Sequence, residues 1–212
     1  MEKSQPPLKG EGAYDYNPRK KDDKIGSGGF GNVFRAIRKH DQQIFAIKIS
    51  KEYLGLLNDD ELQDVLEEIR LMKKFPHPFI VKIIDDYIDS LEHQCIVQEI
   101  YDQGDFNKFL NERQGKLFTE EEVIHFLTNI IIVVHHLNCR GIYHRDLKPE
   151  NFFLKFDSNG KIYLHLSDFG FAKHTKADYF RLTSVFGASK GTLEYLAPEF
   201  HEEHKEKPDI SK

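Results

Sequence analysis

Residues 144–151 read His-Arg-Asp-Leu-Lys-Pro-Glu-Asn, and the triplet Asp-Phe-Gly follows at residues 168–170. The first stretch carries a carboxylate, an ammonium group and a carboxamide at fixed intervals, and the second places another carboxylate beside a glycine. Phosphoryl transfer needs a group that orients the attacking hydroxyl, a cation on the moving phosphate and oxygen ligands for Mg²⁺, because its catalysis is mostly positioning and charge neutralisation. The side chains that would supply these groups, in that order, are Asp146, Lys148, Asn151 and Asp168.

These two motifs resemble the signature of the eukaryotic protein kinases of the serine/threonine type. A solvated, charged turn is the alternative interpretation of a lone His-Arg-Asp triplet, but it does not account for eight matching positions followed by Asp-Phe-Gly. The resemblance implies an α+β, bilobal fold, with a small antiparallel-sheet lobe that holds one helix and a mainly helical second lobe. It also implies ATP and Mg²⁺ as cofactors and serine or threonine hydroxyls of protein substrates as phosphate acceptors.

A glycine-rich stretch at residues 26–31 follows Ile25 and precedes Val33. A Gly-x-Gly-x-x-Gly pattern can also open the first helix of a dinucleotide-binding fold, but β-branched and aromatic residues follow here, which predicts two strands joined by a glycine loop. Glycine lets the backbone approach phosphate groups closely. An ordinary flexible hairpin is the alternative. The presence of Lys48 downstream of the glycine loop argues against it.

Residues 44–49 predict the next strand, which carries Lys48, and residues 58–75 predict a helix capped by Asn58. The helix has an apolar stripe at helical spacing, formed by Leu62, Val65, Leu66, Ile69 and Met72. A carboxylate beside a buried face needs a cation, so Glu68 is expected to pair with Lys48 and aim it at the α- and β-phosphates, as in the resembled family. An exposed Glu68 that pairs with a neighbouring Arg or Lys is the alternative.

Two further strands are predicted near residues 81–87 and 94–99, and residues 100–104 read as a hinge between lobes. By resemblance, the backbone of Glu99 and Tyr101 would hydrogen-bond adenine and Asp105 would reach the ribose. Gln98 stands at the gatekeeper position of the family, and Phe153 stands where an aliphatic residue usually lies under adenine. The residues expected to contact ATP are, in full, Ile25, Gly26, Gly28, Gly31, Val33, Ala46, Lys48, Glu68, Glu99, Tyr101, Asp105 and Phe153.

The second lobe is predicted to contain a helix over residues 119–138, which begins with a capping box at Thr119 and Glu122. Two short strands near residues 152–154 and 162–166 follow the catalytic loop. Residues 168–199 resemble an activation segment that ends in Ala-Pro-Glu. Within this segment, Thr192 matches the Ser/Thr-specific pattern of the family. By the same resemblance, Arg145 of the 144–151 motif would bind a phosphorylated residue of the segment. The candidate acceptors for an upstream activating kinase are Thr183, Ser184 and Ser189.

The resemblance covers residues 16–212 and ends at the start of a helix that the family buries, so we expect a C-terminally incomplete catalytic domain. Residues 1–15 are expected to be a flexible lead-in, residues 16–99 the first lobe and residues 105–212 a partial second lobe. Part of the apolar face of the 119–138 helix would then be exposed, which predicts weak folding or solubility. A non-catalytic nucleotide-binding or scaffold protein of kinase shape is the alternative, but the sequence retains Lys48, Asp146 and Asp168.

Composition limits the other classes of function. Of the 212 residues, 39% are hydrophobic and 31% charged, and the net charge of −5 includes no long basic block, so no nucleic-acid partner is expected. Cys95 and Cys139 lack metal-ligand spacing, which favours a reducing compartment. The N-terminus lacks a signal-peptide core, and the longest aliphatic run, at residues 130–134, is too short to span a membrane. We therefore expect an intracellular, cytoplasmic protein with no membrane partner.

Overall fold

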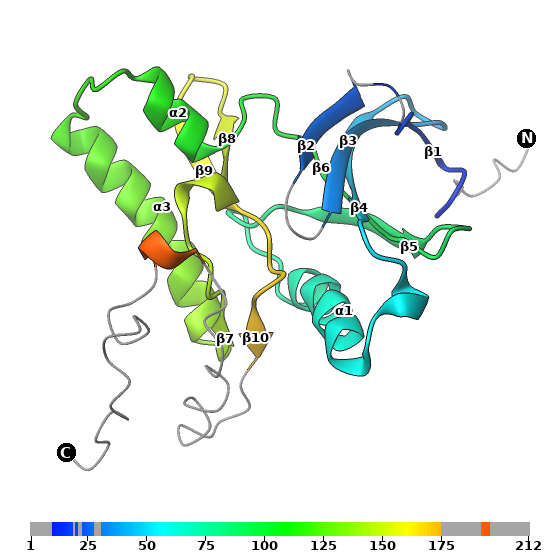
Figure 1. Cartoon of the computed structure of the whole chain (residues 1–212). Coiled ribbons are helices and arrows are strands. Elements are labelled where there is room, and N and C mark those ends of the chain that lie inside the picture. The colour runs from blue at the N-terminus through cyan, green and yellow to red at the C-terminus, as the bar shows by residue number, and fades with distance from the viewer. Residues whose placement is uncertain (1–9, 19, 21–22, 28–30, 175–191, 196–212) are drawn as a thin grey trace, which may run out of the picture. The chain divides into compact units, whose positions relative to one another are not determined.

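A computed structural model describes residues 10–18, 20, 23–27, 31–174 and 192–195. The chain divides into two compact units between Gln103 and Gly104 (Figure 1).

An antiparallel sheet dominates the first unit. Its strands are β1 (Tyr14–Asp15), β2 (Lys24–Ser27), β3 (Gly31–Arg38), β4 (Ile44–Ser50), β5 (Ile83–Ile88) and β6 (Gln94–Glu99). The order is β1-β3-β4-β6-β5, and β2 pairs with the other end of β3. The strands predicted on either side of the glycine loop are therefore present, and no helix follows the loop.

One face of this sheet forms the core of the first unit. Phe34, Ile47 and Val97 are register partners on β3, β4 and β6, so their side chains share this face and are buried together. Ala13 and Tyr14 are buried in the same cluster. The Tyr14 ring stacks parallel to Tyr87 at 6.5 Å and meets Phe45 edge-on at 6.2 Å.

Residues 10–15, which the sequence assigns to a flexible lead-in, are part of the first unit. Besides the buried Ala13 and Tyr14, the Gly10 N–H donates to Asp85 Oδ2 at 3.0 Å and the Tyr14 hydroxyl donates to the same oxygen at 3.4 Å. Buried aromatic surface and two hydrogen bonds hold the segment on the sheet.

Replacement of Tyr14 by alanine is expected to destabilise the first unit by about 3 kcal/mol, because it removes a buried ring from a packed cluster. Urea unfolding of the full chain, followed by circular dichroism, measures this change. Tyr53→Ala is the matched control, since Tyr53 is 45% exposed. Equal stability of the two variants would contradict the assignment of residues 10–15 to the folded unit.

Helix α1 (Asp59–Lys74) packs against β5. Its first backbone bond runs from the Leu62 N–H to the Asn58 carbonyl at 2.9 Å, in agreement with the predicted start. The predicted apolar stripe is correct for Ile69 and Met72, which are buried, but wrong for Leu66, which is 42% exposed. Leu71 is buried instead, because it lies closer than Leu66 to Glu68 around the helix axis.

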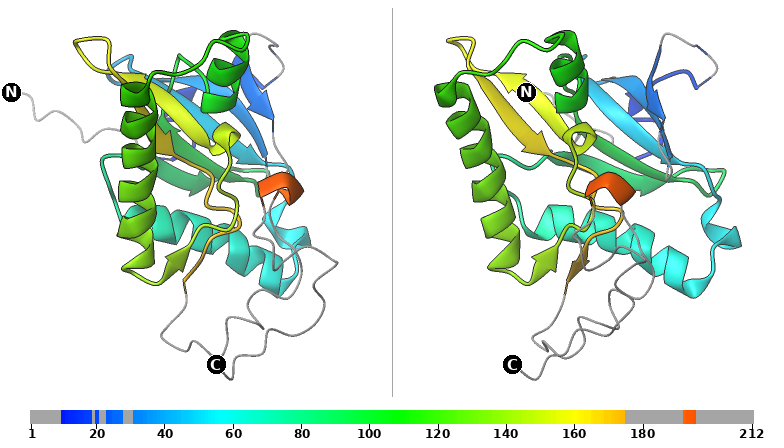
Figure 2. Two further views of the ribbon diagram at one scale, coloured as in Figure 1. Left: turned by 90° about the vertical axis from the view of Figure 1, so that its left-hand side faces the viewer. Right: turned by 60° about the vertical axis from the view of Figure 1, so that its left-hand side comes forward.

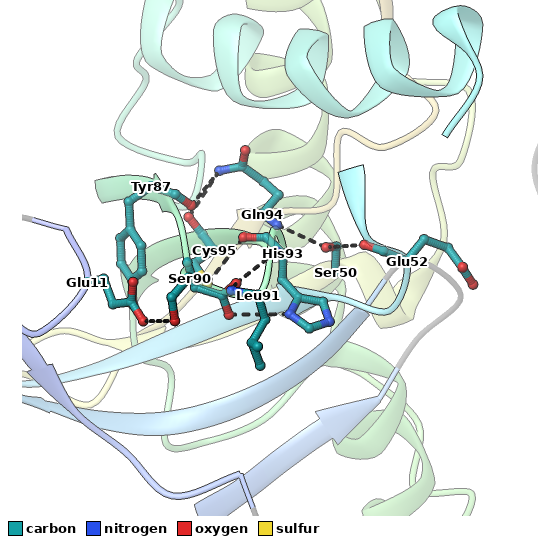
Figure 3. A network of polar contacts seen from close by, with 10 residues as sticks. Glu11, Ser50, Glu52, Tyr87, Ser90, Leu91, His93, Gln94 and Cys95 are labelled. Carbon is teal, nitrogen blue, oxygen red and sulfur yellow. Dashed lines mark hydrogen bonds and ion pairs between the residues drawn. The ribbon is translucent and has the colours of Figure 1, made fainter. Parts of the chain in front are cut away.

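The turn between β5 and β6 is tied to two other segments of the first unit (Figure 3). The Ser50 hydroxyl at the end of β4 accepts the Gln94 N–H at 3.0 Å and donates to the Glu52 carbonyl at 2.9 Å. The Ser90 hydroxyl donates to Glu11 Oε1 at 2.8 Å. Side-chain bonds thus attach this turn to both the β4 end and the N-terminal segment.

The second unit contains two α-helices and two small sheets in its described part (Figure 2). Its elements are α2 (Phe106–Glu112), α3 (Glu120–Asn138), β7 (Ile142–Tyr143), β8 (Phe152–Phe156), β9 (Ile162–Leu166) and β10 (Lys173–His174), with 3₁₀ turns at Pro149–Asn151 and Leu193–Tyr195. Strand β8 pairs with β9 as predicted, whereas α2 and the β7–β10 pair are not predicted from the sequence.

Helix α3 begins with the predicted capping box, in which Thr119 and Glu122 each bond the other's backbone N–H. It packs against β9 and β7 with Phe126, Val133 and Leu137 buried, while Leu127 is 50% and Ile131 62% exposed. Part of its apolar face is therefore exposed, as expected. No helix in the described part of the chain is both long and apolar enough to cross a membrane.

Candidate active site

The residues of the 144–151 motif converge on the Asp146 carboxylate in the second unit. Asp146 Oδ2 accepts Lys148 Nζ at 2.8 Å and Asn151 Nδ2 at 2.9 Å. Asp146 Oδ1 accepts the Thr192 N–H at 3.0 Å and the Thr192 hydroxyl at 2.8 Å. Lys148 Nζ also donates to Thr192 Oγ1 at 2.6 Å. The arrangement joins a carboxylate, an ammonium group and a hydroxyl in one closed set of contacts.

These contacts determine the charge of Asp146. Burial alone would raise the pKa of its carboxyl, but hydrogen bonds from Lys148, Thr192 and Asn151 outweigh burial and hold that pKa below its ordinary value. The carboxylate is therefore ionised at neutral pH and can accept a proton or orient a hydroxyl.

Two residues beside Asp146 fix the catalytic loop to the Asp-Phe-Gly segment. His144 is buried, its Nε2–H donates to the Ser167 carbonyl at 3.0 Å, and its ring meets Phe169 edge-on at 4.9 Å. Burial lowers the pKa of His144, which keeps the imidazole neutral. Arg145, with φ +66°, donates from Nε to the Phe171 carbonyl at 2.5 Å. The predicted role of Arg145 as a phosphate clamp stays a prediction.

The two predicted metal ligands flank adjoining ends of the paired strands β8 and β9: Asn151 immediately precedes β8, and Asp168 lies two residues after β9. The Ser167 N–H and hydroxyl both bond the Asn151 carbonyl, at 2.8 and 3.1 Å, so Asp168 follows a residue that is fixed to Asn151. Since Asn151 Nδ2 donates to Asp146, the metal contact predicted for Asn151 would fall to its amide oxygen. A carboxamide oxygen and a carboxylate are hard ligands that suit Mg²⁺.

The predicted ion pair of the first unit is present. Lys48 Nζ lies 2.7 Å from Glu68 Oε1, and the two side chains are 16% and 8% exposed. The alternative of an exposed Glu68 paired with a neighbouring Arg or Lys is therefore wrong. Breaking a pair of this burial is costly, because the remaining charge would be left without compensation.

Strand register places other predicted ATP contacts beside Lys48. Val33 is the cross-strand partner of Lys48, and Ala46 lies two residues before it, so all three side chains share one face of the sheet. Gly26 pairs with Val33, and Ile25 is 48% exposed.

Gly31 is required by the sheet itself, a reason that the sequence does not reveal. A Cβ atom at Gly31 would lie 2.4 Å from the Ile49 backbone oxygen, whereas one at Gly26 would meet Val33 at an ordinary 3.6 Å. Of these two described glycines, Gly31 is the one constrained by the approach of β3 to β4.

Gly31→Ala is expected to destabilise the first unit by about 2 kcal/mol, because the new methyl group overlaps backbone that cannot rotate away. Gly26→Ala is the matched control and is expected to change stability by less than about 0.5 kcal/mol. Chemical denaturation of both variants tests this difference, and an equal loss in both would refute the steric explanation.

In the segment that precedes the second unit, one backbone group of a residue expected to bind adenine already has a hydrogen-bond partner in the protein. The Glu99 N–H donates to the Lys82 carbonyl at 3.0 Å, so the adenine contact predicted for Glu99 would fall to its carbonyl group. The Tyr101 hydroxyl donates to Glu99 Oε2 at 3.3 Å, and burial, with a smaller effect of Glu99, raises the pKa of Tyr101. Gln98 is half-buried, with Ala46 and Ile83 as its register partners.

Asp105 has a structural role that the sequence does not reveal, as the N-cap of α2. Its Oδ1 accepts the Lys108 N–H at 2.8 Å, which leaves the predicted ribose contact to the other carboxylate oxygen. Phe153 on β8 forms a backbone bridge with Asp105, and the Leu154 N–H donates to the Gly104 carbonyl at 3.0 Å.

Some predictions lie outside the described residues. They concern Gly28, the candidate phosphorylation sites Thr183, Ser184 and Ser189, and the segment after residue 195. Among the described residues, no cluster of three or more His, Cys, Asp or Glu could hold a metal ion, and both cysteines are free thiols. Burial raises the pKa of the Cys95 thiol to about 12, so this thiol is unreactive at neutral pH.

Comparison with known proteins decides the family. A family model described as "Protein kinase domain" matches residues 19–210. The chain belongs to the protein kinase family. This membership confirms the resemblance of the motifs and the predicted α+β kinase fold.

Two of the following three relatives of this kinase chain are serine/threonine-protein kinases by name, and the third is named as a kinase subunit. Serine/threonine-protein kinase Nek6 of Oryza sativa subsp. japonica is 31% identical over 84% of this chain and 31% of its own length. Serine/threonine-protein kinase 36 of Pongo abelii is 34% identical over 84% of this chain and 12% of its own length. Inhibitor of nuclear factor kappa-B kinase subunit alpha of Xenopus tropicalis is 34% identical over 85% of this chain and 24% of its own length. The chain therefore spans about a third or less of these relatives.

Proposed function

We propose that the chain is an ATP-dependent serine/threonine protein kinase, which transfers the γ-phosphoryl group of Mg-ATP to serine or threonine hydroxyls of protein substrates. The arrangement around Asp146 carries this proposal. Its ionised carboxylate holds a threonine hydroxyl, that of Thr192, at 2.8 Å, and the same hydroxyl accepts Lys148 Nζ at 2.6 Å. A substrate hydroxyl between a carboxylate and an ammonium group would have the same chemical surroundings.

In the proposed reaction, Asp146 orients the substrate hydroxyl and accepts its proton. The hydroxyl oxygen forms a bond to the γ-phosphorus of ATP while the bond from that phosphorus to the β–γ bridging oxygen breaks, and ADP leaves. Lys148 stabilises the negative charge of the transferred group. Lys48, fixed by Glu68, binds the α- and β-phosphates, and the glycine loop contributes its backbone N–H groups. Asn151 and Asp168 would hold Mg²⁺, which supplies charge neutralisation on the phosphate oxygens when bound.

The remaining contacts of the nucleotide are proposed from the same family pattern. The backbone of Glu99 and Tyr101 would bind adenine, and Asp105 would bind the ribose. Apolar side chains at Ile25, Val33, Ala46 and Phe153 would cover the base.

Regulation and location are part of the proposal. An upstream kinase would phosphorylate one of Thr183, Ser184 and Ser189, and Arg145 would bind the new phosphate, since a guanidinium fork matches its oxygens. A cytoplasmic location is supported by the two free cysteines, which suit a reducing compartment.

Phosphoamino-acid analysis tests the proposed acceptor. After incubation with Mg-ATP labelled in the γ-phosphate and a generic basic protein, the label is expected on serine and threonine and not on tyrosine. Omission of the divalent metal is the control and should abolish transfer. Label confined to tyrosine would contradict the proposal.

A further inference from the structure

Helix α1 carries a second ion pair to the sheet, besides Lys48–Glu68, in the described part of the chain. Lys73 in its last turn pairs with Asp86 on β5, and these side chains are 49% and 26% exposed. A third pair, Arg70–Glu67, joins residues of the helix itself and makes no link to the sheet.

The two pairs to the sheet reach one row of side chains. Ile96 on β6 is the register partner of both Lys48 on β4 and Asp86 on β5. Cross-strand partners point to the same face, so Lys48 and Asp86 flank Ile96 on the face against which α1 packs. One row of the sheet therefore holds both anchors of the helix.

On the helix, the two attached residues lie on different flanks. Glu68 and Lys73 are five residues apart, which places them about 7.5 Å apart along the axis and about 140° apart around it. A helix held only at Glu68 could still turn about its axis or swing at its other end. With both pairs formed, a rotation that relieves one pair stretches the other.

The strand that carries Asp86 is itself anchored from its opposite face. Asp85, the preceding residue, accepts the Gly10 N–H and the Tyr14 hydroxyl, and Tyr87 stacks on Tyr14. The turn that follows β5 is bound to Glu11 through Ser90 (Figure 3). Residues 10–15 precede the part of the chain that the family model matches, residues 19–210, so this support comes from outside that match.

We infer that Lys73 and Asp86 are positioning residues, which fix the orientation of α1 so that Glu68 reaches Lys48. The inference deepens the proposed function, because its consequence for Mg-ATP rests on the nucleotide role of Lys48. An ion pair as exposed as Lys73–Asp86 adds little to the stability of a fold. Its loss should therefore change the surroundings of Lys48 much more than the melting temperature.

The first test needs no nucleotide. Acylation of Lys48 by an amine reagent, followed by mass spectrometry, is expected to be about three- to tenfold faster in Asp86→Asn and Lys73→Met than in the original chain. Arg70→Gln, which breaks the ion pair within the helix, is the matched control and should leave the rate unchanged. An unchanged rate in Asp86→Asn would overturn the inference, whatever the chain does with ATP.

A double-mutant cycle then separates positioning from a merely structural role. In a Glu68→Gln background, Asp86→Asn is expected to add no further increase in Lys48 acylation, because the pair that it positions is already absent. The charge exchange Lys73→Glu with Asp86→Lys is expected to restore the original rate. An equal increase with and without Glu68, or a failed exchange in a chain with an unchanged melting temperature, would contradict the inference.

The same variants have an expected kinetic effect if the proposed function holds. Asp86→Asn should raise the KM for ATP by about three- to tenfold and change kcat less, since Lys48 contacts the nucleotide and not the acceptor. Lack of phosphoryl transfer by the original chain would disprove the proposed function alone, and the acylation result would still decide the role of Lys73 and Asp86.

Discussion

Replacement of Asp146 by asparagine is expected to lower kcat for phosphoryl transfer by about a thousandfold and to change the KM for ATP little. The amide cannot accept the proton of the substrate hydroxyl, although it is nearly the same size as the carboxylate. It also leaves Lys148 without its ionic partner at 2.8 Å. Steady-state kinetics with labelled ATP and a generic basic protein measures both constants.

Glu112→Gln is the matched control for this variant, because Glu112 is a carboxylate whose side chain is 64% exposed and lies on α2. It should retain the original kcat. A kcat of Asp146→Asn within tenfold of the original value would show that this carboxylate is not the base.

Lys48→Met is expected to lower kcat/KM for ATP by about a hundred- to a thousandfold, because it removes the cation proposed to bind the α- and β-phosphates. The variant should also lose about 3 kcal/mol of stability, since Glu68 is left buried and without its ammonium partner. Kinetics and urea unfolding of the same preparation measure the two effects.

A further variant separates the two effects of Lys48. In Lys48→Met with Glu68→Gln, the buried charge is removed as well, so stability should recover in part while kcat/KM stays low. Lys39→Met, at an exposed lysine of the β3–β4 turn, is the control for loss of charge. Normal kinetics in Lys48→Met would contradict the proposed nucleotide contact.

The sequence predicts those parts of the structure that depend on local patterns. Strand alternation predicts β3, β4 and β6, and the capping box at Thr119 predicts the start of α3. The Lys48–Glu68 pair spans 20 residues, yet it was predictable because both residues belong to a family motif. Motifs of this kind encode a distant contact in residue type and spacing.

Contacts that depend on tertiary packing could not be predicted in this way. The N-terminal segment reaches Asp85 across 75 residues, and no local signal separates it from a polar lead-in. Thr192 contacts Asp146 across 46 residues, so the sequence indicates its match to the Ser/Thr-specific pattern but not its contact with Asp146. The seven residues of α2 are too few for a clear helical period, and the need for glycine at residue 31 arises from the Ile49 carbonyl on another strand.

The most direct measurement is transfer of radiolabelled γ-phosphate from Mg-ATP to a generic basic protein by the original chain, Asp146→Asn and Lys48→Met, measured side by side. We expect transfer by the original chain and at least a hundredfold less by either variant, with folding of each verified by circular dichroism. Transfer that persists in both variants, or no transfer by a folded original chain that binds Mg-ATP, would contradict the claim that this site is a working kinase centre.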